Sequence, residues 1–159
     1  MQERPRNLNR IDRNILRILQ DNGRITYADL ARQVGLTTTP CIERVKRLER
    51  EGFIRGYGAL VNPDFLDAGL IIFVQIKLDR TSKNSFDKFR TAVVRLSEVQ
   101  ECYLVSGNFD YLLKARVADM SAYREFLGET LLSVPGVQES TSIVVMEAAK
   151  ETLKIELPY

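Results

Sequence analysis

The spacing of the apolar residues changes near residue 62, and this change limits the chain to one class of fold. Before it, apolar residues recur every three or four positions, as they do along helices. After it, apolar runs rich in residues that favour β-strands alternate with further helical segments. Each part of the 159-residue chain is long enough for one small domain. The pattern predicts an α+β protein with a helical domain followed by a mixed domain.

The first helical segment extends from Leu8 to Gln20, with its apolar residues on one face. Asn7 or Asn9 is positioned to cap its start, because an asparagine side chain accepts a bond from a free backbone N–H group. Gly23 is expected to close the helix in the left-handed conformation.

A second, shorter helix begins after Thr26. Thr26 and Asp29 have the spacing of a capping box, in which a hydroxyl is followed three residues later by a carboxylate. Leu30 and Val34 contribute to its buried face, and Gly35 is expected to end it.

A third helix is expected from about Pro40 to Glu51, after a tight turn. Thr39 is the expected N-cap, and Pro40 suits the first helical position because it lacks an N–H group. The expected buried stripe consists of Ile42, Val45 and Leu48. The opposite face is expected to carry Thr39, Glu43, Arg47 and Arg50, flanked by Arg44 and Lys46.

A short helix, a turn with glycine and a longer helix with a cationic face are typical of a helix-turn-helix. Such a helix fits the major groove of DNA. Residues 1–62 carry 12 Lys and Arg against 7 Asp and Glu, whereas residues 63–159 carry 11 against 14, so only the first part favours a polyanion. The expected DNA-binding residues are Tyr27, Thr37, Thr38, Thr39, Pro40, Glu43, Arg44, Lys46, Arg47 and Arg50. The other interpretation is an ordinary amphipathic helix with a solvated basic face.

The stretch from Phe53 to Val61 is expected to be extended, although two glycines weaken it as a lone strand. It is either a wing or a connecting strand that pairs with another subunit. We expect a winged-type helix-turn-helix domain over residues 1–62, a linker over 63–69, a second domain over 70–146 and a C-terminal tail over 147–159.

The second domain has the pattern β-α-β-β-α-β. Strands are expected over residues 70–78, 99–106, 111–117 and 137–145. Asn84 and Asp119 are the expected caps of the two helices. The expected buried faces of these helices carry Phe86, Phe89, Val93 and Leu96, and then Met120, Tyr123, Leu127 and Leu131.

This order predicts a ferredoxin-like domain, with two helices on one face of an antiparallel sheet. About 75 residues cannot cover both faces of the sheet, so its second face implies a partner surface. We therefore expect a homodimer, which also suits near-palindromic double-stranded DNA.

The chain contains no histidine, which excludes catalytic sites and metal centres that need an imidazole. Cys41 and Cys102 are too few for a disulfide framework or a zinc site. A phosphate-binding glycine loop and an obvious carboxylate pair are also missing. We expect no enzyme activity, no metal ion and no cofactor. Cys41, near a helix start, either has a lowered pKa or is a small buried residue, and the second interpretation is favoured.

The sequence has no apolar run of about 18 residues or more, so no transmembrane helix is expected. The first residues are polar and lack the apolar core of a secretory signal. These observations, together with the two isolated cysteines, favour a cytoplasmic protein with no membrane partner. The expected DNA binding would associate it with the nucleoid.

Two long motifs resemble the Lrp/AsnC, or feast/famine, family of transcription regulators. The first comprises residues 8–16, 35–49 and 52–54, and the second comprises residues 101–113 and 132–137. The resemblance implies a sequence-specific regulator of amino-acid metabolism genes, with a ferredoxin-like effector-binding domain. It also implies dimers that assemble into tetramers, octamers or larger forms, and an amino-acid effector such as leucine between subunits.

The resemblance places the effector near one loop and the wall of a neighbouring subunit. The effector-binding residues that it implies are Ser106, Gly107, Asn108, Asp110, Tyr111, Leu132, Pro135, Gly136, Val137 and Thr141. Backbone N–H groups at Gly107 and Asn108 suit the carboxylate of an amino acid, and Asp110 suits its ammonium group. The other interpretation is that these residues only form a hairpin turn. For the whole protein, the alternative is an architectural DNA-binding protein with little sequence preference and no effector.

Overall fold

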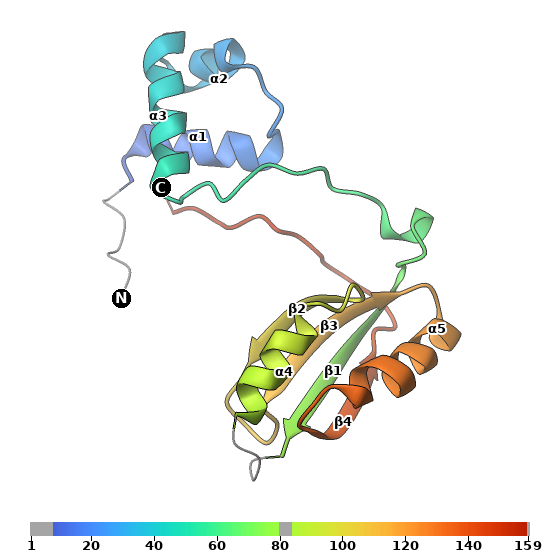
Figure 1. Cartoon of the computed structure of the whole chain (residues 1–159). Helices are drawn as coiled ribbons and strands as arrows, with labels where there is room; N and C mark the ends of the chain where they lie inside the picture. The colour runs from blue at the N-terminus through green and yellow to red at the C-terminus, as the bar shows by residue number, and fades with distance from the viewer. Residues whose placement is uncertain (1–7, 80–83, 159) are drawn as a thin grey trace. The chain divides into compact units, whose positions relative to one another are not determined.

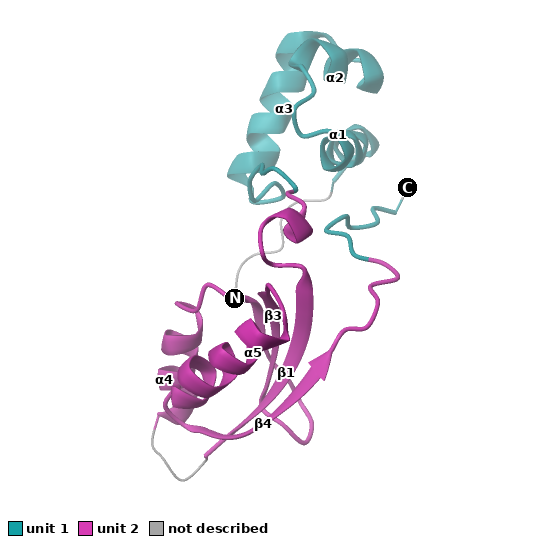
Figure 2. Ribbon diagram, turned by 90° about the vertical axis from the view of Figure 1, so that its right-hand side faces the viewer, with its two compact units in different colours: residues 1–60, 151–159 teal, residues 61–150 magenta. Residues whose placement is uncertain are grey.

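The computed structural model describes residues 8–79 and 84–158, in two compact units (Figure 2). The first unit contains residues 1–60 and 151–159, and the second contains residues 61–150. The units therefore divide close to residue 62. The end of the chain, which was expected to be part of a separate tail, belongs to the first unit.

Three helices form the first unit: α1 (Arg10–Asp21), α2 (Tyr27–Val34) and α3 (Thr38–Arg50) (Figure 1). The Asn9 side chain accepts a bond from the backbone N–H of Asp12 at 2.9 Å, as expected, whereas Asn7 lies outside the described residues. The Thr26 hydroxyl accepts the backbone N–H of Asp29 at 3.1 Å, which confirms that cap.

The two glycines expected to end helices have different roles. Gly35 closes α2 in the left-handed conformation, with a φ of 71°, as expected. The expectation for Gly23 is wrong, because α1 ends at Asp21 with Asn22 as its C-cap and Gly23 does not have a positive φ. A Cβ on Gly23 would lie 3.3 Å from Cδ1 of Tyr57, so this glycine gives room for the tyrosine ring.

The start of α3 also differs from the expectation. Its N-cap is Thr37 rather than Thr39, and Pro40 is the third helical residue. The first-turn N–H groups of a helix have no helical acceptor, so a proline fits at any of these positions.

The core of the first unit joins all three helices. Its buried residues are Ile15, Leu16, Leu30, Ala31, Cys41, Val45 and Leu48. Val45 and Leu48 of the expected stripe are buried, but Ile42 is only half-buried, and Cys41, which was not part of that stripe, is completely buried.

The C-terminal segment lies along α1. Leu157 packs against the core of the unit. Arg13 donates to the backbone oxygen of Pro158, and Arg17 donates to that of Leu157, each at 2.7 Å. The Gln20 side chain both accepts from and donates to the backbone of Ile155. The tail therefore contributes to the packing of the helical unit.

Residues 53–61 contain no strand in the structure. A strand requires a partner for its backbone groups, and no such partner exists for this segment within the described part of the chain. The expected wing or connecting strand is therefore not formed by one chain.

The second unit has the expected order of elements: β1 (Leu70–Leu78), α4 (Ser85–Val93), β2 (Val99–Leu104), β3 (Tyr111–Val117), α5 (Met120–Glu125) and β4 (Val137–Val144). The strands form one antiparallel sheet in the order β2-β3-β1-β4, which is the ferredoxin-like arrangement. The bounds of β1 and β3 match the expectation. β2 and β4 end earlier than expected, at Leu104 and Val144.

Helices α4 and α5 cover one face of the sheet (Figures 1 and 2). Alternate residues of β1 and β3 point to this side and are buried, including Ile72, Val74 and Leu113. The residues between them lie on the other side, which we call the open face. Strand register brings together there Ile71, Phe73, Gln75, Lys77, Tyr103, Leu112, Lys114, Thr141 and Ile143.

Two expectations about the helices of this unit are corrected. Asn84 is the N-cap of α4 but has a φ of 67° and makes no capping bond with its side chain. Met120 is exposed rather than inward, and Phe126 is buried in the core. A π-helical turn over Phe126–Thr130 follows α5, and its wider winding changes which residues face the sheet. Asp119 caps α5 as expected, through the backbone N–H groups of Ser121 and Ala122.

Candidate DNA interface and ligand pocket

The outer side of α3 carries a stripe of exposed polar residues. The stripe consists of Thr39, Glu43, Lys46 and Arg50. Their spacing of four, three and four residues places them on one line along the helix. Lys46 and Arg50 are exposed cations without an ion pair in the described structure. This stripe has the shape and charge of a major-groove-reading surface.

The start of α3 adds exposed donors to this stripe. Thr37, Thr38 and Thr39 are all exposed, and Thr37 makes no capping bond with its side chain. The first turn of α3 contains no acidic residue, so its backbone N–H groups remain favourable to a phosphate. Tyr27, at the first position of α2, is 41% exposed.

Two of the expected DNA-contacting arginines have a different orientation from the one expected. Arg44 and Arg47 are half-buried and turn from α3 towards α1. Nη1 of Arg44 lies 2.9 Å from Oδ1 of Asp12, and Nη2 of Arg47 lies 2.5 Å from Oδ2. The outward position expected for Arg47 is therefore corrected, because a buried carboxylate on the neighbouring helix attracts its side chain.

Cys41 has the character of a buried apolar residue. Its side chain is completely buried, and burial raises the pKa of its thiol although Arg44 acts in the opposite direction. The thiol is thus held in its neutral form, which argues against a reactive cysteine.

The loop between β2 and β3 contains the first group of expected effector-binding residues. Ser106, Gly107 and Asn108 are exposed, and Gly107 has a φ of 147° that few other residues adopt. Asp110 differs from the expectation. Its carboxylate is buried and accepts the backbone N–H of Leu78 at 2.8 Å, so Asp110 anchors the loop to β1.

A cavity of about 90 Å³ lies between this loop and the open face of the sheet. Its walls consist of Gln75, Lys77, Asn108, Phe109, Glu139 and Thr141. Nζ of Lys77 lies 3.4 Å from Oε2 of Glu139 across β1 and β4. A cation and an anion at one small cavity match the two charged groups of a free amino acid.

The remaining expected effector-binding residues do not line this cavity. Tyr111 is buried against Phe89, with ring centroids 4.7 Å apart, and belongs to the core. Leu132 is exposed, and Gly136 approaches Ser85 at the start of α4. Val137 packs partly on the core. Of the expected residues, only Asn108 and Thr141 come together at the cavity.

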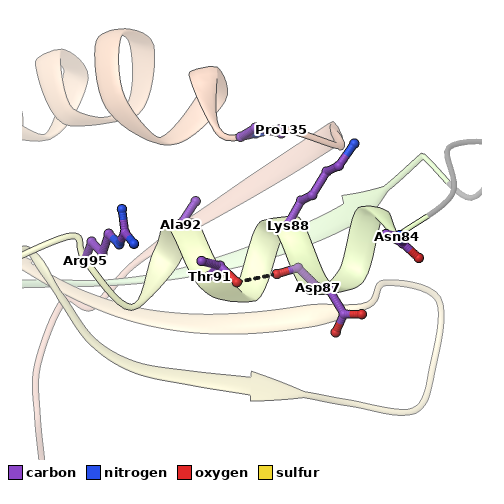
Figure 3. Close-up of a pocket in the computed structure, with 7 residues that line it drawn as sticks. All are labelled: Asn84, Asp87, Lys88, Thr91, Ala92, Arg95 and Pro135. Carbon is purple, nitrogen blue, oxygen red and sulfur yellow. Dashed lines mark hydrogen bonds between the residues drawn. The ribbon is translucent and has the colours of Figure 1, made fainter.

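Pro135 lines a different groove, along the outer side of α4. The other residues lining it are Asn84, Asp87, Lys88, Thr91, Ala92 and Arg95. Figure 3 shows Lys88 extending from α4 towards the segment that carries Pro135, with Asp87 on the other side of the helix. The groove is broad and open, with a volume of about 460 Å³.

Five residues of these sites were not predicted from the sequence: Gln75, Lys77, Phe109 and Glu139 at the cavity, and Asp12 beside α3. Lys77 and Gln75 alternate with buried residues of β1, and two polar side chains on one side of an apolar strand were a usable signal. No sequence pattern marked Asp12 as buried, because a single carboxylate among arginines is typical of a solvent-exposed helix face.

The described residues contain no helix that is long and apolar enough to span a membrane. Within the same part of the chain, no three or more Cys, Asp or Glu side chains gather where they would hold a metal ion.

Comparison with known families agrees with this architecture. A winged helix-turn-helix DNA-binding model matches residues 8–55, and the Lrp/AsnC ligand binding domain matches residues 71–155. The matches cover both units and confirm the fold class inferred from the sequence.

Individual relatives match almost the entire chain. The leucine-responsive regulatory protein of Escherichia coli K12 is 58% identical over 150 residues, which are 94% of this chain and 92% of that protein. The solved structure of a transcriptional regulator from Neisseria meningitidis with L-methionine has a TM-score of 0.90 and 37% identity, covering 94% of this chain and 97% of that one. A feast or famine regulatory protein from M. tuberculosis with L-methionine has a TM-score of 0.85 and 31% identity, over 94% and 99%. With a helix-turn-helix unit, a ligand-binding unit and relatives of this similarity, the chain belongs to the Lrp/AsnC family of transcription regulators.

Proposed function

We propose that this protein binds specific DNA sites through the exposed stripe of α3 and that an amino acid bound at the cavity beside the β2–β3 loop modulates this binding. The observation that carries the first part is the line of Thr39, Glu43, Lys46 and Arg50 on a helix whose other side is packed in the core. The stripe combines groups that bond to base edges with cations that neutralise phosphates.

The second part of the proposal rests on the charges at the cavity. Lys77 suits an α-carboxylate, Glu139 suits an α-ammonium group, and Asn108 and Thr141 add polar groups. A volume of about 90 Å³ suits the charged end of an amino acid rather than a whole leucine, so a neighbouring subunit is needed to enclose the side chain. A relative is named for leucine and two solved relatives carry methionine, which makes these the first ligands to test.

The open face of the sheet supports a homodimer as the form that binds DNA. Phe73, Leu112 and Ile143 lie there among charged residues, on the side of the sheet away from α4 and α5. A dimer presents two α3 helices to near-palindromic DNA, and further assembly into tetramers or octamers is consistent with the family. The proposed location is the cytoplasm, with the protein bound to the nucleoid, and no enzyme activity is proposed.

DNA specificity is tested by selection from random duplexes, followed by measurement of affinity for the selected and a scrambled sequence. We expect a ratio of about 10³ or more and a steep loss of affinity with salt. A ratio near one would instead assign the protein an architectural role.

The effector is tested by a thermal-shift screen of the twenty amino acids. A ligand that binds only the folded protein raises its unfolding temperature. We expect leucine or methionine to give the largest increase and to change affinity for the selected DNA. An absence of any shift at millimolar concentrations would reject the effector part of the proposal and leave the DNA part standing.

A further inference from the structure

Asp12 is a buried carboxylate in the DNA-binding unit, and it lies outside the surface assigned to DNA. It stands in the first turn of α1 and is 1% exposed. A carboxylate so far removed from water needs compensating charge. The positive end of the α1 dipole contributes part of it, and two side chains of α3 contribute the rest.

The two partners of Asp12 come from one side of α3. Arg44 and Arg47 are three residues apart, so both guanidinium groups reach the same carboxylate. Each carboxylate oxygen has its own arginine, at 2.9 Å for Arg44 and 2.5 Å for Arg47. This arrangement fixes both the distance between α1 and α3 and the rotation of α3 about its axis.

The rotation of α3 decides which residues face DNA. With Arg44 and Arg47 held against α1, the outward side of the helix is the stripe that contains Glu43, Lys46 and Arg50. A small rotation would move this stripe out of line with the base edges and turn an arginine outward in its place. Nε of Arg47 is also buried, which places the inner part of its guanidinium group against the protein rather than in solvent.

We infer that Asp12 is a positioning residue for DNA recognition: it holds Arg44 and Arg47 away from the phosphates and thereby aligns the outer stripe of α3 with the bases. This inference rests on the proposed DNA binding through α3. Arg44 and Arg47 hold α3 in its orientation by pairing with Asp12, whereas Lys46 and Arg50 supply the phosphate contacts.

The arginines are compared first, with Arg47→Gln and Arg50→Gln in the full chain. The measurement is the dependence of DNA affinity on salt concentration, because each neutralised phosphate contributes about 0.9 to the slope. We expect Arg50→Gln to lower the slope by about one and Arg47→Gln to leave it unchanged. An equal decrease in both variants would overturn the inference.

Asp12→Asn then tests the positioning role directly. The amide keeps the shape of the side chain but removes its charge, so one arginine is released to solvent. We expect the affinity for scrambled DNA to show a slope steeper by about one, and the ratio of selected to scrambled affinity to fall about tenfold. If both affinities fell by the same factor, Asp12 would be a stability residue only.

Two controls separate this inference from other failures. Each variant is measured below its own unfolding temperature, determined by circular dichroism. If Asp12→Asn does not fold, Arg44→Gln takes its place beside Arg47→Gln, and an unchanged slope in both supports the inference while a lowered slope contradicts it. A wild-type protein that does not distinguish selected from scrambled DNA would reject the proposed function itself.

Discussion

Lys77 and Glu139 show how single side chains give the open face of the sheet a specific chemistry. They lie opposite each other on β1 and β4 and are 45% and 63% exposed. A salt bridge that is so exposed contributes little to stability. Their exposure leaves both side chains with hydrogen-bonding capacity for a charged ligand, as the proposed function requires.

Replacing Lys77 tests the cavity at the residue scale. We expect Lys77→Met to weaken amino-acid binding about tenfold or more, because a hydrogen bond between charged groups is lost. Isothermal titration calorimetry with the amino acid found in the thermal-shift screen measures the change. Lys88→Met is the matched control, since Lys88 lies in the groove on α4 and not at the cavity. Equal losses in both variants would show that the effect is not local.

Cys41 allows a second prediction at this scale. Burial raises the pKa of its thiol above the ordinary value of 9.0. The folded protein therefore retains the proton at a pH where the unfolded chain loses it, and the free energy of unfolding falls as pH rises above about 9. We expect iodoacetamide at pH 8 to modify Cys41 slowly in the native protein and quickly in urea, as measured by peptide mass spectrometry. Rapid native labelling would mean that Cys41 is accessible.

At the scale of elements, the helical unit depends on a segment from the far end of the chain. The C-terminal segment supplies backbone acceptors for Arg13 and Arg17 of α1, and Leu157 adds apolar contact with the core. Lys154 also forms an ion pair with Asp21. Short helices gain most of their stability from such packing rather than from their own propensity.

Leu157→Ala tests this dependence. We expect it to lower the free energy of unfolding of the helical unit by about 1 kcal/mol, because a partly buried leucine loses part of its apolar contact. Leu153→Ala is the control, since Leu153 lies in the same segment but is 81% exposed. Chemical denaturation followed by circular dichroism provides the measurement, and equal effects of the two substitutions would contradict a packing role for the tail.

At the scale of the whole molecule, the described helices of the second unit lie on only one face of its sheet. Helices α4 and α5 bury one face of the sheet, and the open face carries Phe73, Leu112 and Ile143 between charged residues. An apolar surface of this kind is a common site of protein association. This property joins the two parts of the proposed function, since the proposed dimer would double the DNA contacts and enclose the effector at the cavity.

Ile143→Asp tests the association. Ile143 is 46% exposed on the edge strand β4, so we expect a charge there to oppose dimer formation without preventing folding. Val94→Asp is the control, at a position 72% exposed beyond the end of α4. Light scattering coupled to size-exclusion chromatography should show a lower mass for Ile143→Asp alone. An unchanged mass would place the interface elsewhere.

Much of the fold and part of the site follow from local patterns. Three features depend only on neighbours in sequence and were predictable for that reason: the cap of α2 at Thr26 and Asp29, the end of α2 at Gly35, and the alternation of buried residues along β1. The exposed threonines at the start of α3 follow from the turn that precedes them. The unpaired state of residues 53–61 was not predictable, because a strand depends on a partner from elsewhere.

The sequence by itself determined two domains, the order of their elements and the helix that carries the proposed DNA-facing residues, because hydrophobic period, caps and turns act over a few residues. Only the tertiary structure decided that Arg44 and Arg47 turn to Asp12, that Asp110 anchors a loop, and that Lys77 meets Glu139. Each of these contacts joins residues about 30 or more positions apart. Such contacts depend on how helices and strands pack, which a local pattern does not contain.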